Sequence, residues 1–146
     1  MATFTIYDEF LRYLADGSID LDTHSFKAML TDTAPNQGTH TLKADVTEIS
    51  AGVGYTAGGV TLTSVTWAET GAGTGIWRWS SANPSWTASG GAIATHRYLV
   101  VYDDTPTTPL KPLVGYVDRG STATIADGNT RTWTLSTGWF EIDATP

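Results

Sequence analysis

The chain has 146 residues, the size of one ordinary domain, and a hydrophobic content of 40% that suffices to form a core. Its formal net charge of −7 repels phosphate backbones and anionic lipids, so we expect neither nucleic acid nor a membrane as a partner. The absence of cysteine excludes disulfides, thiolate metal sites and cysteine-based catalysis. We expect no membrane span and no secretion signal, because no apolar run approaches about 18 residues.

The composition predicts an all-β protein. Charged residues make up 16% of the chain, below the usual share of about a quarter. Threonine, serine and glycine are plentiful, and aromatic residues reach 11%, with six tryptophans. These residue types favour strands whose exposed faces carry hydroxyl groups and whose turns need glycine.

The first predicted element is an amphipathic helix over residues 5–16. Thr5 is placed to cap it, and Ile6 and Phe10 begin an apolar stripe at helical spacing. Gly17 follows as a stop signal.

Strand-like segments follow the helix. The residue pattern predicts a strand over 24–31 and either a short helical turn or irregular structure over 42–50. The prolines within residues 105–109 predict a hairpin loop, and Ala-Asp-Gly-Asn at 126–129 predicts a tight turn. From Val60 onward the runs of β-branched and aromatic residues predict about eight or nine strands. These runs are VTLTSVTWAE (60–69), GIWRWSS (75–81), SWTAS (85–89), AIATHRYLVVYDD (92–104), PLVGYVDRG (112–120), STATIAD (121–127), RTWTLS (131–136) and GWFEID (138–143).

The strand patterns predict a two-sheet antiparallel β-sandwich, jelly-roll or immunoglobulin-like, with one N-terminal α-helix. Residues 98–102 are apolar in succession, which is typical of a central strand covered on both faces. Residues 131–136 alternate, which predicts one face in solvent. We expect a single domain over residues 1–146, with an N-terminal arm and helix at 1–17 and the sandwich at 18–146.

A glycine-rich stretch has the spacing of a dinucleotide-binding turn, Gly-x-Gly-x-x-Ala, at residues 52–57. Such a turn follows a strand and opens a helix whose N-terminal amides hold the pyrophosphate. Here residues 60–63 form a strand pattern instead. We therefore interpret Gly54, Gly58 and Gly59 as structural positions that need a positive φ or a close approach of the backbone.

Histidine positions give no catalytic or metal-binding signal. His24, His40 and His96 are far apart, and none has a partner at the spacing that places two imidazoles on one face. Arg97 or His96 is placed to pair with Asp118, a contact common without function. No nucleophile elbow is present. We expect no catalytic residue, no bound metal and no cofactor.

The acidic residues Asp16, Asp20 and Asp22 resemble in content a calcium loop, which clusters carboxylate oxygens. Ser18 and Ile19 stand where such a loop needs a ligand and a turn residue. We therefore expect a solvated acidic surface there.

The tryptophans offer the strongest candidate for a binding surface. Trp77 and Trp79 lie on one side of a predicted strand, with Arg78 on the other. A pair of this kind is either a stacking platform for sugar rings or a hot spot for a protein partner. The alternative, which we favour for at least half of the six tryptophans, is a place in the sandwich core.

The chain also resembles a family of small virion structural proteins from tailed bacteriophages. The resemblance rests on the segments HSFKAMLTDTAP, ADVTEIS, GYTAGGVTLT, RYLVVYDDT and PLVGYVDRGSTATIADG, which follow the N-terminal helix in this order. They cover most of the chain but are packing and turn motifs. The segment IWRWSSANPSW departs from the pattern. The resemblance implies that the protein is a structural component of the capsid shell, the neck or the tail.

We expect a capsid decoration (cement) protein that binds the major capsid protein of an assembled icosahedral shell, as a homo-oligomer on the virion surface after synthesis in the host cytoplasm. The alternatives are a neck or tail component and a carbohydrate-binding module that uses Trp77 and Trp79. The helix or the arm at residues 2–5 is the expected anchor, so deleting residues 1–16 should abolish binding and leave the sandwich folded. The candidate partner-binding residues are Phe4, Ile6, Phe10, Trp77, Arg78 and Trp79.

Overall fold

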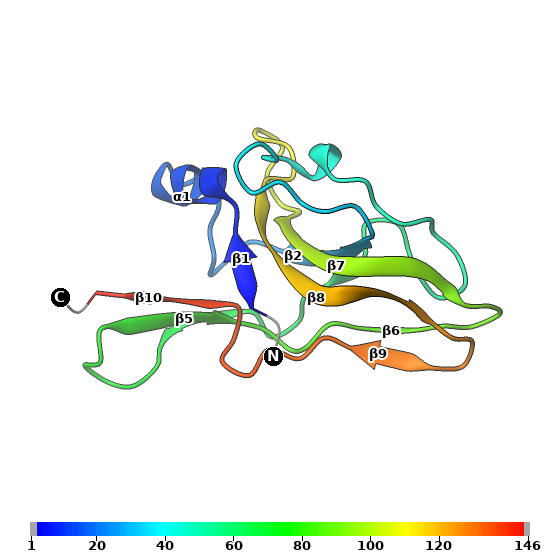
Figure 1. Ribbon diagram of the computed structural model, residues 1–146. Helices are drawn as coiled ribbons and strands as arrows, with labels where there is room; N and C mark the ends of the chain where they lie inside the picture. Colours follow the sequence, from blue (N-terminus) through cyan, green and yellow to red (C-terminus); the bar gives the residue numbers. More distant parts are fainter. Residues whose placement is uncertain (1–2, 145–146) are drawn as a thin grey trace.

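The computed structural model describes residues 3–144 and consists mostly of antiparallel β-strands with one α-helix (Figure 1). This confirms the all-β class and the N-terminal helix. The elements are β1 (Phe4–Ile6), α1 (Asp8–Ala15), β2 (Phe26–Thr31), the 3-10 turn η1 (Lys43–Asp45), β3 (Val60–Thr61), β4 (Thr66–Glu69), β5 (Ile76–Ser80), β6 (Ser85–Thr87), β7 (Ile93–Asp103), β8 (Leu113–Ile125), β9 (Thr130–Thr132) and β10 (Phe140–Asp143).

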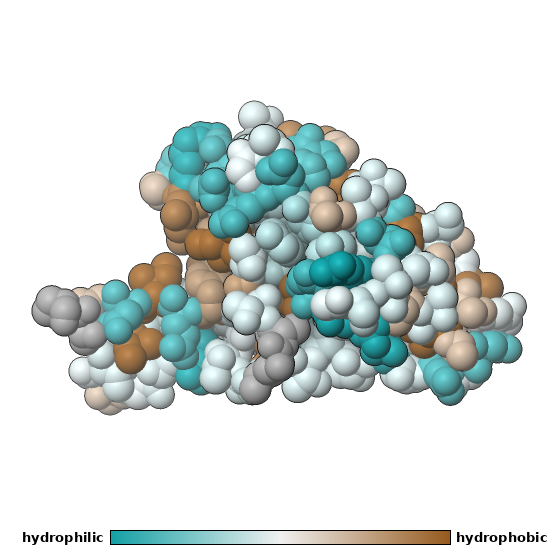
Figure 2. Space-filling view, in the orientation of Figure 1, coloured by the Kyte–Doolittle hydropathy of each residue, from teal (hydrophilic) through white to brown (hydrophobic). Residues whose placement is uncertain are grey.

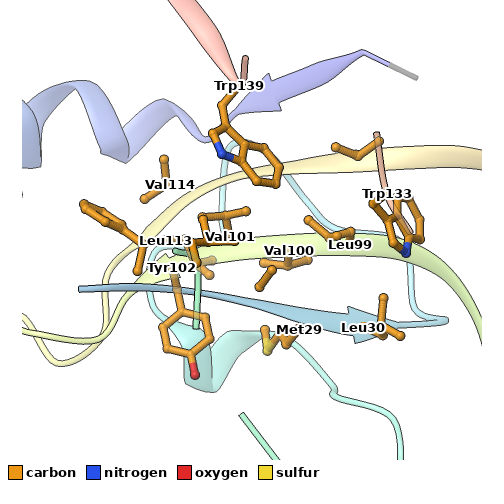
Figure 3. Close-up of a cluster of buried hydrophobic side chains, with 14 of the residues drawn as sticks. Met29, Leu30, Leu99, Val100, Val101, Tyr102, Leu113, Val114, Trp133 and Trp139 are labelled. Carbon is orange, nitrogen blue, oxygen red and sulfur yellow. The ribbon is translucent and has the colours of Figure 1, made fainter. Parts of the chain in front are cut away.

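The largest sheet has the strand order β1-β8-β7-β2-β3, which places β7 in the centre. The successive side chains Leu99, Val100, Val101 and Tyr102 of β7 are all fully buried, as Figure 3 shows. The prediction of a central strand covered on both faces is therefore confirmed. Its burial supplies much of the hydrophobic stabilisation, at about 25 cal/mol for each Å² of apolar surface removed from water.

The N-terminal helix begins later than predicted. Residues Phe4–Ile6 form β1, in which Thr5 pairs with Tyr116 of β8, so Thr5 does not cap the helix. Asp8–Ala15 form α1, with Tyr7 at the N-cap and no capping hydrogen bond from its side chain. Pairing with a distant strand satisfies the backbone groups that the sequence pattern assigns to a first helical turn.

The hairpin of β7 and β8 follows the prediction for the proline-containing loop. At the base of this hairpin, the carboxylate of Asp104 makes ion pairs with the ammonium groups of Lys27 at 3.1 Å and Lys111 at 2.8 Å. The two predicted strands at 112–120 and 121–127 form a single strand, β8, which continues through Gly120. A glycine tolerates the positive φ of 88° there without ending the pairing.

Two smaller sheets, with strand orders β10-β5-β4 and β6-β9, follow one another along one side of the five-stranded sheet (Figure 1). Aromatic contacts join them to it. The ring of Trp79 in β5 lies 4.8 Å from that of Phe26 in β2, and the ring of Trp133 lies 6.4 Å from that of His96 in β7. The ladder of β9 ends at Thr132, earlier than the predicted strand 131–136, but burial still alternates beyond it, with Trp133 buried between the exposed Thr132 and Thr134.

The glycine-rich stretch leads into strand β3, as predicted. Gly54, Gly58 and Gly59 all have positive φ angles, of 98°, 89° and 77°. A Cβ atom on Gly59 would lie 1.8 Å from the carbonyl oxygen of Ala28 in β2. The backbone of this loop therefore lies against the neighbouring strand at a distance that only glycine permits. The side-chain hydroxyl of Tyr102 fixes the loop by donating to the carbonyl of Gly58 at 2.8 Å.

Candidate partner-binding site

An apolar hollow of about 410 Å³ lies between α1, the loop that follows it and the three-stranded sheet. Leu14 of α1, Ile19 and Leu21 of the loop, and Trp67 of β4 line it. Figure 2 shows hydrophobic side chains on both walls of this concavity. We call this hollow, together with the exposed side chains Trp77 and Ile142 that continue its lower wall, the α1–β5 groove.

The upper wall of the groove is held in place by hydrogen bonds. Gly17, with a φ of 79°, ends α1 in the left-handed conformation that is common at helix C-termini. The amide of Ile19 then donates to the carbonyl of Tyr13 at 3.1 Å. The indole N–H of Trp79 donates to the carbonyl of Leu21 at 3.2 Å and so ties the loop to β5. The groove is therefore preformed.

The lower wall is the inner face of the β10-β5-β4 sheet. The register opposes Ile142 to Trp77 and Trp67 to Trp79, and side chains two residues apart share a face. Trp77 is 40% exposed and Ile142 is 41% exposed. The ring of Trp77 stacks on that of Trp67 at 5.8 Å. This end of the sheet therefore keeps an apolar inner face in contact with solvent.

The outer face of the same sheet is polar. Arg78 of β5 makes an ion pair with Glu141 of β10 at 2.6 Å, and the hydroxyls of Thr66 and Ser80 lie 2.8 Å apart. The sheet is thus amphipathic, with its polar side toward solvent and its aromatic side toward the groove.

A chain of aromatic rings connects the groove to the core. Phe140 of β10 lies 6.2 Å from the ring of Trp67, 5.5 Å from that of Phe10 and 5.6 Å from that of Trp79. Its ring also stacks with that of Phe4 at 6.2 Å. The position of the half-buried Trp67, and with it that of the exposed Trp77, is therefore fixed by neighbours on several elements.

The rim of the groove carries negative charge. Asp20 and Asp22 line it from the loop, and Glu69 is the cross-strand neighbour of Trp77. Within residues 3–144, no lysine or arginine lies within ion-pair distance of these three carboxylates. The hydroxyl of Thr23, followed by the amides of Asp22 and Thr23, donates to Asp20 and lowers its carboxyl pKa. Asp20 is therefore ionised at neutral pH.

The structure separates the candidate residues taken from the sequence. Trp77 is exposed in the groove, but Trp79 is fully buried, so the pair does not form the expected two-ring platform for sugars. The rings of Phe26, Trp139 and Phe140 surround Trp79, whereas the ring of Trp77 contacts that of Trp67. Arg78 lies on the opposite face and is paired with Glu141.

The N-terminal candidates belong to the packed structure. Phe10 is 1% exposed, and the half-buried residues Phe4 and Ile6 of β1 pack against the core. Residues 3–17 are therefore no free arm, because they contribute an edge strand and a core helix. Residue 2 of the expected anchor lies outside the described residues.

Most residues of the groove and of its supporting cluster are not identified as candidates from the sequence. Phe140 and Ile142 come from β10, which lies next to Trp77 only through pairing over a long sequence separation, whereas Trp67 lies in β4, the strand that precedes β5 in the chain. Leu11 of α1 is 55% exposed but does not line the hollow. The apolar stripe of the helix, to which Leu14 belongs, is the signal readable from the pattern.

The polar residues weighed in the sequence take up other contacts. Arg97 and Asp118 form the expected pair, with two hydrogen bonds of 2.7 and 2.8 Å. His24 contacts the buried carboxylate of Asp103, Nδ1 to Oδ2 at 2.6 Å, and burial raises the pKa of Asp103. His96 is buried. In residues 3–144, no three His, Cys, Asp or Glu side chains gather in an arrangement that could hold a metal ion.

Comparison with known proteins gives no relative. No protein-family model matches the chain, and neither a curated protein nor a solved structure shows significant similarity to it. Among residues 3–144, no helix has the length and apolarity required to cross a membrane.

Proposed function

We propose that the protein is a virion structural protein of a tailed bacteriophage, and specifically a capsid decoration (cement) protein. It binds the major capsid protein on the assembled icosahedral shell as a homo-oligomer and adds stability by burying surface against its neighbours. Its role is structural and not catalytic. It is made in the cytoplasm of the bacterial host and functions on the capsid surface.

The observation that carries this proposal is the resemblance of the segments HSFKAMLTDTAP, GYTAGGVTLT and PLVGYVDRGSTATIADG to small virion proteins. In the fold these segments supply β2, the glycine-rich loop with β3, and β8. The resemblance therefore concerns the framework of the five-stranded sheet. The α1–β5 groove adds support, because exposed apolar surfaces with a polar surround are typical of protein interaction sites.

We also propose that the two smaller sheets act as one layer, which would make the molecule a β-sandwich. The contacts of Trp79 with Phe26 and of Trp133 with His96 support this, because each joins a smaller sheet to the five-stranded one. A jelly-roll or immunoglobulin-like topology remains a prediction. A crystal structure in which the smaller sheets pack away from the five-stranded sheet would contradict the proposal.

The decisive experiment is the copy number of this protein in purified virions, measured by quantitative mass spectrometry against the major capsid protein. We expect a copy number comparable to that of the shell subunit. A small multiple of three or six copies per particle would instead identify a neck or tail component. Absence from the virion would overturn both assignments.

A further inference from the structure

We propose that the α1–β5 groove binds a polypeptide segment of another protein that combines large apolar side chains with lysine or arginine. The identity of that protein as a virion component rests on the proposed function. The chemistry of the segment rests on the groove alone.

The apolar part of the inference follows from the two walls. Trp77 and Ile142 keep 40% and 41% of their surfaces in solvent although both belong to the inner face of an amphipathic sheet. Across the hollow, Leu14 lines the helical wall. A rigid aromatic surface next to aliphatic side chains is typical of hot spots, and a segment that inserts apolar side chains would remove both walls from water together.

The basic part follows from the rim. Asp20, Asp22 and Glu69 border the apolar surface, and within residues 3–144 no lysine or arginine pairs with them, although the amides of Gly73 and Gly75 donate to Glu69. An apolar segment with lysine or arginine beside its anchors would neutralise these carboxylates, and an acidic segment would be repelled. The same charge disfavours a second copy of this chain in the groove, because each copy has a net charge of −7.

A glycan fits the groove less well than a peptide. Sugar-binding sites stack rings on exposed aromatic faces, but one face of Trp77 is already occupied by Trp67, and Trp79 is buried. Neutral sugars would also bring no positive charge to complement the rim carboxylates.

The experiment uses three fluorescein-labelled synthetic peptides and the full chain. In the first peptide leucine alternates with lysine, in the second leucine alternates with glutamate, and in the third serine alternates with lysine. Fluorescence anisotropy measures the dissociation constant of each at low salt. We expect the leucine–lysine peptide to bind about tenfold or more tightly than either of the others. Raising the salt to about 1 M, where the Debye length is about 3 Å, should weaken its binding.

Paired variants assign the binding to the groove. Trp77→Ser and Ile142→Ser, each tested separately, should weaken binding of the leucine–lysine peptide about tenfold. Leu110→Ser is the control, because Leu110 is 57% exposed on the β7–β8 hairpin and does not line the hollow. Asp22→Asn should weaken binding of the leucine–lysine peptide severalfold. Asp32→Asn makes the same change of charge on the exposed Asp32, beside a different hollow. Circular dichroism establishes that each variant is folded.

Each outcome decides between the possibilities. The inference is overturned if the leucine–glutamate peptide binds equally well, or if the groove and control variants have the same effect. Displacement of the bound peptide by a neutral oligosaccharide would favour a glycan site instead. Specific peptide binding by a protein that is absent from virions would retain the groove chemistry and reject the capsid assignment, so the two proposals fail separately.

Discussion

At the scale of single residues, two glycines with similar positive φ angles differ in the atoms that surround them. Gly59 and Gly128 have nearly equal φ angles of 77° and 79°. A Cβ on Gly59 would collide with the carbonyl of Ala28, whereas a Cβ on Gly128 would meet no atom within 4 Å. Alanine substitutions at the two positions therefore separate the free-energy cost of a positive φ from that of a steric collision.

We predict that Gly59→Ala lowers the free energy of unfolding by about 3 kcal/mol or more, because conformational strain and overpacking add. Gly128→Ala should cost only about 1 to 2 kcal/mol, the strain of the left-handed conformation. Urea unfolding followed by circular dichroism measures both. Equal losses would show that the loop before β3 moves away from β2 at little cost.

A second prediction concerns pH. Burial, the largest cause, lowers the pKa of His96, with Arg131 and Arg119 acting in the same direction and a hydrogen bond to the carbonyl of Ala94 opposing them. The unfolded chain therefore takes up this proton near pH 6.5, before the folded protein does. Stability should fall as the pH decreases below about 6.5, by up to about 1.4 kcal/mol per pH unit, until His96 itself is protonated in the fold.

The variant His96→Gln tests this prediction, because its neutral side chain keeps a donor for the Ala94 carbonyl. Between pH 7 and pH 5 its unfolding free energy should change less than that of the wild type. An unchanged pH dependence would assign the acid sensitivity to other groups.

At the scale of elements, the N-terminal segment is part of the framework. β1 extends the five-stranded sheet at one edge, and α1 buries Phe10 and Tyr13 against it. Deleting residues 1–16 would therefore remove a paired strand and core side chains. Loss of binding in that truncated chain would not distinguish an anchor from a damaged fold.

Two neighbouring substitutions in α1 measure its contribution. We predict that Phe10→Ala lowers the free energy of unfolding by about 3 to 5 kcal/mol, because Phe10 is 1% exposed and contacts Phe140. Leu11→Ala, at a position 55% exposed, should change it by less than about 0.5 kcal/mol. Chemical denaturation of both variants checks this. A Phe10→Ala protein as stable as the wild type would make α1 an appended element.

The sequence predicts elements with strong local signals and fails where distant strands decide. The apolar run of β7, the proline-containing hairpin and the glycine-rich entry to β3 are readable because each depends on its own residues. The local pattern assigns Thr5 to a helix, because its strand partner, Tyr116, lies far along the chain. Likewise, only cross-strand register brings Ile142 beside Trp77, so the candidate site was recognised in part.

At the scale of the whole molecule, the aromatic contacts predict cooperative unfolding. Trp79 and Phe140 link the three-stranded sheet to β2, α1 and β1. The tryptophans and the backbone should therefore lose their native signals in one transition. Urea curves recorded by tryptophan fluorescence and by far-UV circular dichroism should coincide. A separate early transition in fluorescence would show that the three-stranded sheet unfolds independently.

The unequal exposure of the tryptophans has a spectroscopic consequence. Trp79, Trp86, Trp133 and Trp139 are at most 7% exposed, and Trp67 is half-buried, so the solvent-exposed part of the intrinsic emission comes mainly from Trp77. Acrylamide should quench this red-shifted component first. A molecule that covers the ring should shift the emission to shorter wavelength and protect it from quencher. The chain thus carries its own label-free optical reporter at the groove.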